Sequence, residues 1–237
     1  TSEMQQETRW AINYLAERIQ MAGSGVPPTC GWQVIENIDG TSGASDSLNI
    51  LGCYKSLVLE TTQTMGNSGS QVKVNNSSGT GIGDLCVISD GTFTEIFLVT
   101  DINDLHLWHK AAPPWNDDNK LDHAYGLGST VSVVSYYSFF EEVDEEGRKN
   151  LMVQTQAYVP QILIGDIDTF QIRFKMKDGS WIDDPYEDEL VDIRMVEITV
   201  RAKSPKPLKG YIDPAYGDAY KRLEMKTIVI PKNITII

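Results

Sequence analysis

The first 23 residues carry a single helical stripe, and this feature constrains the fold more than any other in the sequence. Small or apolar side chains recur at helical spacing among charged ones, at Met4, Thr8, Ala11, Ile12, Leu15, Ile19 and Ala22. Gly23, a favoured C-terminal cap residue, ends the pattern, and the Pro27-Pro28 pair prevents its return. We therefore predict an amphipathic helix over residues 4–22 whose apolar face packs on another part of the chain.

After residue 31 the pattern changes to short runs of Thr, Val, Ile, Tyr and Phe separated by Gly, Asn, Asp and Ser. Candidate strands lie at 56–60, 84–89, 94–102, 130–140, 151–158, 169–176, 192–202 and 223–231. Asp90-Gly91 and residues 177–180 predict tight turns. Residues 37–47 and 66–83 are typical of long loops, and residues 203–218 are expected to cross the surface between the last two strands.

Apolar and polar residues alternate at 170–176 and at 193–200, which is typical of a sheet covered on one face. One helix of about six turns cannot cover so large a sheet. The sequence therefore predicts an α+β fold in a single domain, 1–237. Its N-terminal amphipathic helix, 1–23, packs on an antiparallel β head, 31–237, which contains a second sheet or one strongly curled sheet.

The formal net charge of -13 makes nucleic acid an unsuitable partner, because phosphate binding needs clustered Lys and Arg. The acidic residues gather in two runs, 141–146 and 183–189, which are typical of solvated loops. Asp178, Asp183 and Asp184 bracket a turn and could hold a weak, structural calcium ion, although their spacing is not that of an EF-hand. No other cofactor is expected.

Catalytic motifs are scarce in this sequence. It contains no Gly-x-Ser-x-Gly elbow, and the glycines of 79–83 lack a Walker lysine and a following helix pattern. His106 and His109 are three apart in a segment that does not read as helix, so packing or surface roles are favoured over a metal site. Trp115, Trp181 and Tyr186 lie beside acidic residues and could form a sugar platform, but the sequence does not place two carboxylates across one cleft, as a glycosidase needs. We expect no enzymatic activity and no small-molecule substrate.

The three cysteines fit neither a paired framework nor a zinc motif. Cys30 and Cys53 flank a Gly- and Ser-rich loop that a disulfide could close in an oxidising compartment, and isolated thiols are the alternative. Cys86 lies in an apolar run and is expected to be a buried thiol.

The helical pattern begins at the first residues, without a leader or a linker. We expect from this that an upstream segment has been removed. The sequence has no apolar run of membrane length.

Residues 15–23, LAERIQMAG, resemble the end of the post-membrane helix of minor type IV pilins of the PilW type. Further segments are similar to strands of that family in the same order: 83–88, 170–174 with 178–181, 191–202, and the closing 220–233. Residues 191–202, VDIRMVEITVRA, carry the strongest similarity.

This resemblance implies a pilin-like structural subunit that acts in the initiation or at the tip of a bacterial pilus. Its partners would be other minor pilins, the major pilin and the inner membrane, reached through an N-terminal hydrophobic half-helix. It would face the periplasm before assembly and become extracellular afterwards. Two alternatives stay open: a J-type pseudopilin of a type II secretion system, and a calcium- or carbohydrate-binding adhesive head.

Overall fold

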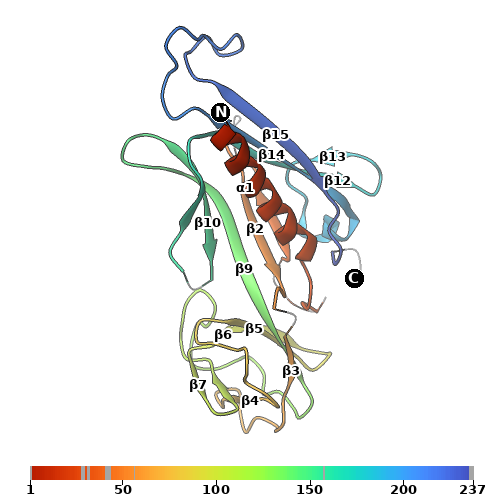
Figure 1. Cartoon of the computed structure of the whole chain (residues 1–237). Coiled ribbons are helices and arrows are strands. Elements are labelled where there is room, and N and C mark those ends of the chain that lie inside the picture. Colours follow the sequence, from red (N-terminus) through yellow and green to blue (C-terminus); the bar gives the residue numbers. More distant parts are fainter. Residues whose placement is uncertain are drawn as a thin grey trace.

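Helix α1, Ser2–Met21, lies along one end of an elongated molecule (Figure 1). The computed structural model describes residues 2–27, 30, 33–40, 44–55, 57–156 and 158–234. The helix ends as predicted, because Gly23 adopts a left-handed φ of 77° and its N–H donates to the carbonyl of Leu51 at 2.9 Å.

The strands form three sheets in the described residues, so the second sheet of our prediction is present and a single curled sheet is not. The eight-stranded sheet contains β1 (Ile35–Ile38), β2 (Ser47–Gly52), β3 (Val58–Glu60), β5 (Leu85–Ser89), β6 (Thr94–Leu98), β9 (Thr130–Val143), β10 (Lys149–Thr155) and β11 (Gln161–Ile164). The four-stranded sheet has the order β13 (Trp181–Ile182), β12 (Ile167–Met176), β14 (Ile193–Lys203) and β15 (Arg222–Val229). A small sheet joins β4 (Val72–Lys73), β8 (His106–Trp108) and β7 (Asp101–Asn103), and a 3₁₀ helix, η2, spans Glu187–Asp192.

Strand β9 connects the two ends of the molecule. Its second half, from Ser135 onward, pairs with β2 and β10 beside the helix. Its first half, Thr130 to Val134, pairs with β3 and β5. The chain between β2 and β9 therefore forms a separate lobe beyond the C-terminal end of α1, which we call the distal lobe, residues 57–129 (Figure 1).

Three hydrophobic clusters follow this division. The largest packs the inner face of α1 against strands of both larger sheets, with Phe139, Phe170 and Phe174 fully buried. A second fills the distal lobe around Phe97 and Tyr125. A third cluster lies between these two regions. It contains Leu51 and Cys53, at the end of β2, together with Leu85, Val87, Ile96 and Val134.

The strands with clear alternation lie close to their predicted bounds, and several other strands, most of them short, were not predicted. Residues 94–102 form two strands, β6 and β7, instead of one. Strands β1, β2, β8, β11 and β13 were not predicted, and β4 lies inside the predicted loop 66–83. Part of the predicted loop 37–47, residues 41–43, and the first residue of the predicted strand 56–60 lie outside the described residues.

Candidate functional site

The inner face of α1 consists of the residues that the helical stripe in the sequence predicted to be buried. Ala11, Leu15, Ile19 and Ala22 have no exposed surface, and Ile12 is almost completely buried. Met4, nearer the start of the helix, is partly buried against the same cluster. Burying one aliphatic side chain of this size contributes roughly 1.5 to 3 kcal/mol, so this face fixes the helix firmly to both sheets.

Arg18 makes a second attachment between the helix and the sheet. Its guanidinium lies 4.0 Å from the ring centroid of Tyr14 and 5.1 Å from that of Tyr137 on β9. The hydroxyl of Tyr54 donates to the carbonyl of Arg18 at 2.9 Å, and burial raises the pKa of Tyr54. The cation and the rings therefore hold the last turns of α1 to β9 and to the segment that follows β2.

The outer face of α1 carries one large apolar side chain. Trp10 is 56% exposed, and it lines a groove of about 450 Å³ between the helix and β11. Ile162 of β11, which is 61% exposed, lies in the same groove. Strand β11 ends the main path of the eight-stranded sheet, so the groove follows a strand edge as well as a helix. We call this surface the Trp10–Ile162 groove. Sequence reasoning did not single it out, because Trp10 falls outside the helical stripe and β11 was not predicted.

The predicted cysteine and calcium residues lie in the following places. Cys30 packs against the third cluster, which contains the buried thiol of Cys53. The bridge between them stays a prediction, and a count of reactive thiols in denaturant tests it. Burial raises the pKa of Cys86, as expected for a thiol inside an apolar run.

The carboxylates proposed for calcium have partners of their own. Asp178 accepts hydrogen bonds from the backbone N–H and the hydroxyl of Ser180, and these bonds lower its pKa. Asp183 accepts from Nε of Arg173 at 2.8 Å, and Asp184 is exposed. In the described part of the chain, no group of three or more His, Cys, Asp or Glu residues could hold a metal ion. Calcium binding stays a prediction without support from this geometry.

His109 and His123 pack within the distal lobe, and His106 is half-buried with Nδ1 3.2 Å from the carbonyl oxygen of Asn103. His109 is buried, with Nε2 3.0 Å from the carbonyl oxygen of Ser70, and His123 stacks on Phe93. Both tryptophans considered for a sugar platform are half-buried. Trp115 packs edge-on to Tyr136, and Trp181 lies under the side chains of Arg173 and Lys175.

Among the described residues, no helix has both the length and the apolar character needed to cross a bilayer.

Comparison with known proteins gives little for this chain. No family model matches the sequence, and no curated protein matches it. Among solved structures, it is similar to a type IV-like pilin from Thermus thermophilus, with a TM-score of 0.46, 10% sequence identity and coverage of 98% of each chain. Because this TM-score lies below 0.5, the similarity by itself assigns neither a family nor a function.

Proposed function

We propose that this chain is the head of a minor type IV pilin, a structural subunit that acts in pilus initiation or at the pilus tip. The observation that carries the proposal is the double character of α1. Its inner face, centred on Leu15 and Ile19, is fixed to both sheets, while Trp10 on its outer face stays exposed. A helix of this kind suits a subunit that is held by its own head on one side and by neighbours on the other.

The strand motifs that resemble minor pilins of the PilW type support the same proposal. They coincide with β5, β12, β14 and β15. Three of these strands, β12, β14 and β15, belong to the four-stranded sheet, and α1 packs on β14 and β15 of that sheet. Two of the segments that carry the resemblance are thus among those that hold the helix.

In this proposal, α1 continues an apolar upstream segment that lies in the inner membrane before assembly and in the filament core afterwards. Pulling on that segment loads the helix along its axis, and the buried face with the Arg18 ring contacts passes the load to β9. The Trp10–Ile162 groove then receives a neighbouring pilin. The distal lobe lies at the other end of the molecule, away from the membrane.

The gene sequence upstream of Thr1 tests the pilin assignment. We expect a short basic leader, a glycine at the peptidase junction and about twenty consecutive apolar residues. A gene whose upstream sequence codes for a different domain, or that starts without such a segment, would overturn the proposal.

The groove is tested by the double variant Trp10→Glu with Ile162→Glu in the producing cell. A buried charge at a subunit contact is costly, so we expect at least a tenfold loss of surface pili at unchanged cellular levels of the protein. The matched control is Ile82→Glu with Leu127→Glu, two exposed apolar residues of the distal lobe. Normal piliation by the groove variant would remove the groove from the assembly surface.

A second candidate, an adhesive head, is favoured by one observation in the distal lobe. Trp115 lines a cleft of about 560 Å³ together with Asp117, Asp118 and Asp122. An aromatic ring beside carboxylates suits a hydroxylated ligand such as a sugar. A glycan-binding screen with the native chain and with Trp115→Ala tests this role, and equal signals from both chains would exclude it.

A further inference from the structure

We infer that the loop between β14 and β15, residues 204–221, is a docking surface for an anionic lipid bilayer. It extends past the first turn of α1 at the end of the molecule opposite the distal lobe (Figure 1). The inference rests on the proposed function only for its orientation, because a membrane anchor upstream of α1 would bring this same end to the bilayer.

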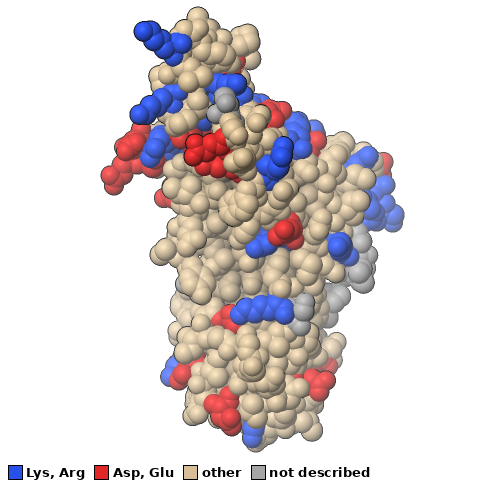
Figure 2. All heavy atoms as spheres, in the orientation of Figure 1, with Lys and Arg blue, Asp and Glu red and all other residues tan. Residues whose placement is uncertain are grey.

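The loop is positively charged in a strongly acidic chain. Residues 204–221 contain three lysines against two aspartates, and Lys203 and Arg222 flank them, although the whole chain has a net charge of -13. Lys206, Lys209 and Lys221 are exposed, and within the described part of the chain none of these three makes an ion pair. Basic side chains gather over this end of the surface in Figure 2.

The two aspartates of the loop lie at its base, where Arg222 binds both of them. Its guanidinium donates two hydrogen bonds of 2.7 Å to the carboxylate of Asp218, and Nη1 lies 3.5 Å from Asp213. Arg222 also reaches Asp168 at 3.0 Å. The acidic charges are thus held at the base of the loop around Arg222, and the lysine charges stay at its outside.

Exposed apolar side chains lie between the lysines. Ile212 is 73% exposed, Tyr216 47% and Leu208 39%. Lysines around an exposed aliphatic side chain and a tyrosine match the interface of a bilayer, where ammonium groups meet lipid phosphates and apolar groups enter the acyl boundary. A soluble acidic protein would match the lysines alone and would leave Ile212 without a favourable partner.

The loop is ordered in advance for such a contact. Backbone hydrogen bonds join Leu208 to Ala219 and Asp213 to Asp218 across it. The hydroxyl of Ser204 accepts from the N–H of Lys221 and donates to the carbonyl of Lys206. A surface that is already ordered loses little conformational entropy when it binds.

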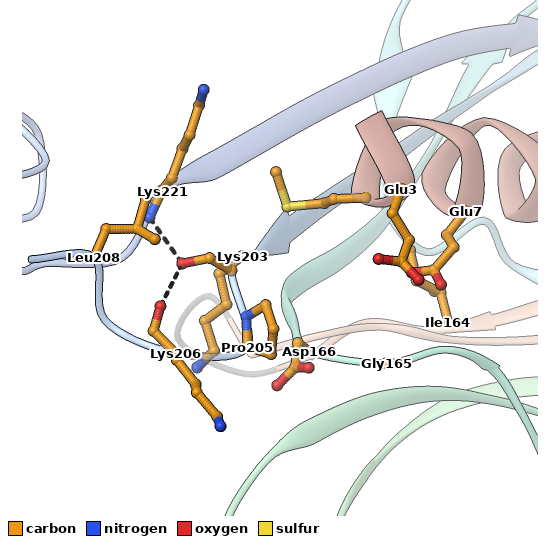
Figure 3. Close-up of a pocket in the computed structure, with 12 residues that line it drawn as sticks. Glu3, Glu7, Ile164, Gly165, Asp166, Lys203, Pro205, Lys206, Leu208 and Lys221 are labelled. Atoms are coloured by element: carbon orange, nitrogen blue, oxygen red, sulfur yellow. Dashed lines mark hydrogen bonds between the residues drawn. The ribbon is translucent and has the colours of Figure 1, made fainter. Parts of the chain in front are cut away.

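A cleft of about 450 Å³ separates the loop from the start of the helix (Figure 3). Glu3 and Glu7 line it from the helix, and Asp166 lines it beside Lys203 and Pro205 (Figure 3). Lys206 and Lys221 extend from the opposite side, away from the helix (Figure 3). The cleft is therefore lined by carboxylates and by lysines, and the ammonium ends of Lys206 and Lys221 lie on the side away from Glu3 and Glu7 (Figure 3).

The test is co-sedimentation of the chain with vesicles of phosphatidylglycerol mixed into phosphatidylcholine, and with phosphatidylcholine alone, at low salt. We expect binding to the anionic vesicles only. Raising the salt should weaken this binding at least tenfold, because salt screens the attraction between each lysine and the anionic surface. The triple variant Lys206→Glu, Lys209→Glu, Lys221→Glu should lose at least tenfold of the binding, and Ile212→Asp severalfold.

The matched control is Lys110→Glu, Lys177→Glu, Lys232→Glu, which changes the net charge equally at three exposed lysines elsewhere. Any loss of vesicle binding by this control measures the general effect of net charge, and it should be less than twofold. Circular dichroism should show that all variants are folded. Equal loss in both triples, equal binding to both kinds of vesicle, or no binding at all would overturn the inference. Capture of an acidic pilin by the lysines without vesicle binding would also overturn it.

These outcomes are separate from those for the proposed function. A chain that has the apolar upstream segment but does not bind anionic vesicles would lose only the lipid contact. A chain that binds the vesicles but lacks the upstream segment would lose the pilin assignment and keep the lipid surface.

Discussion

Arg222 is the residue on which most of the local order at the β14–β15 loop depends. Only 11% of its side chain is exposed, and it contacts Asp168, Asp213 and Asp218, while its guanidinium lies 3.9 Å from the ring centroid of Tyr216. The hydrogen bonds from Arg222 lower the pKa of Asp218 to about 2. One cation therefore fixes the second half of the loop, at Asp213 and Asp218, to the start of β15.

This geometry predicts a specific dependence on pH. Because the folded pKa of Asp218 lies below the usual value of about 3.9, its contribution to stability is fully present above that value and is lost as the pH falls through about 2. A carboxyl titration by NMR should give a midpoint near 2, and Arg222→Met should raise it toward 4.

Asp178 is the internal control for that titration. Its pKa is lowered by Ser180 and not by an arginine, so its midpoint should be the same in both proteins. An unchanged midpoint for Asp218 in the Arg222→Met variant would contradict the proposed role of Arg222.

At the residue scale, the sequence predicted the side chains that follow a local period and missed those defined by distant partners. The helix face from Ala11 to Ala22 follows directly from a spacing of three and four. The groove residue Ile162 and the Arg222 cluster could not be found this way, because their partners lie far away in the chain. Nothing in local sequence brings Asp168 beside Arg222.

At the element scale, the close approach of α1 to β2 determines how the helix sits. A Cβ placed on Gly52, at the end of β2, would lie 2.4 Å from the carbonyl oxygen of Met21 at the end of the helix. The backbone of α1 can therefore reach β2 only because residue 52 has no side chain.

Gly52→Ala should consequently displace the end of α1 and lower the free energy of unfolding by about 1 to 3 kcal/mol, a typical cost of overpacking. Chemical denaturation measures this change. Gly126→Ala is the matched control, because its Cβ would meet nothing within 4 Å, and it should change stability by less than about 0.5 kcal/mol. Equal effects of the two substitutions would show that the contact with Met21 is not limiting.

The elements that the sequence did not predict share a physical cause. Strands β4 and β13 have two residues each, and β8 has three, so no window of alternation exists in them. They are strands because neighbouring strands pair with them, as β12 does with β13 and β7 does with β8. In contrast, β12 and β14 have ten and eleven residues and alternate over much of that length, and their bounds were predicted closely.

At the scale of the whole molecule, β9 joins the distal lobe to the region that contains α1, so that the two can act as one body. It is continuous over 14 residues and changes partners between Val134, which pairs with Leu85, and Ser135, which pairs with Gly52. The third cluster packs around this change of partners and includes residues of both regions. A force or a contact at one end should therefore reach the other through this strand.

The change of partners at Val134 predicts how the molecule unfolds. Calorimetry of the native chain should show a single cooperative transition, since β9 and the third cluster join the two regions. Val134→Ala keeps the ladder and removes buried apolar atoms, so it should lower the transition temperature by an amount that corresponds to about 2 kcal/mol while the transition stays single. Val134→Pro also removes the backbone donor in the middle of a central strand, and it should split the transition into two. Two separate transitions in the native chain would instead mean that the distal lobe is an independent domain inserted between β2 and β9.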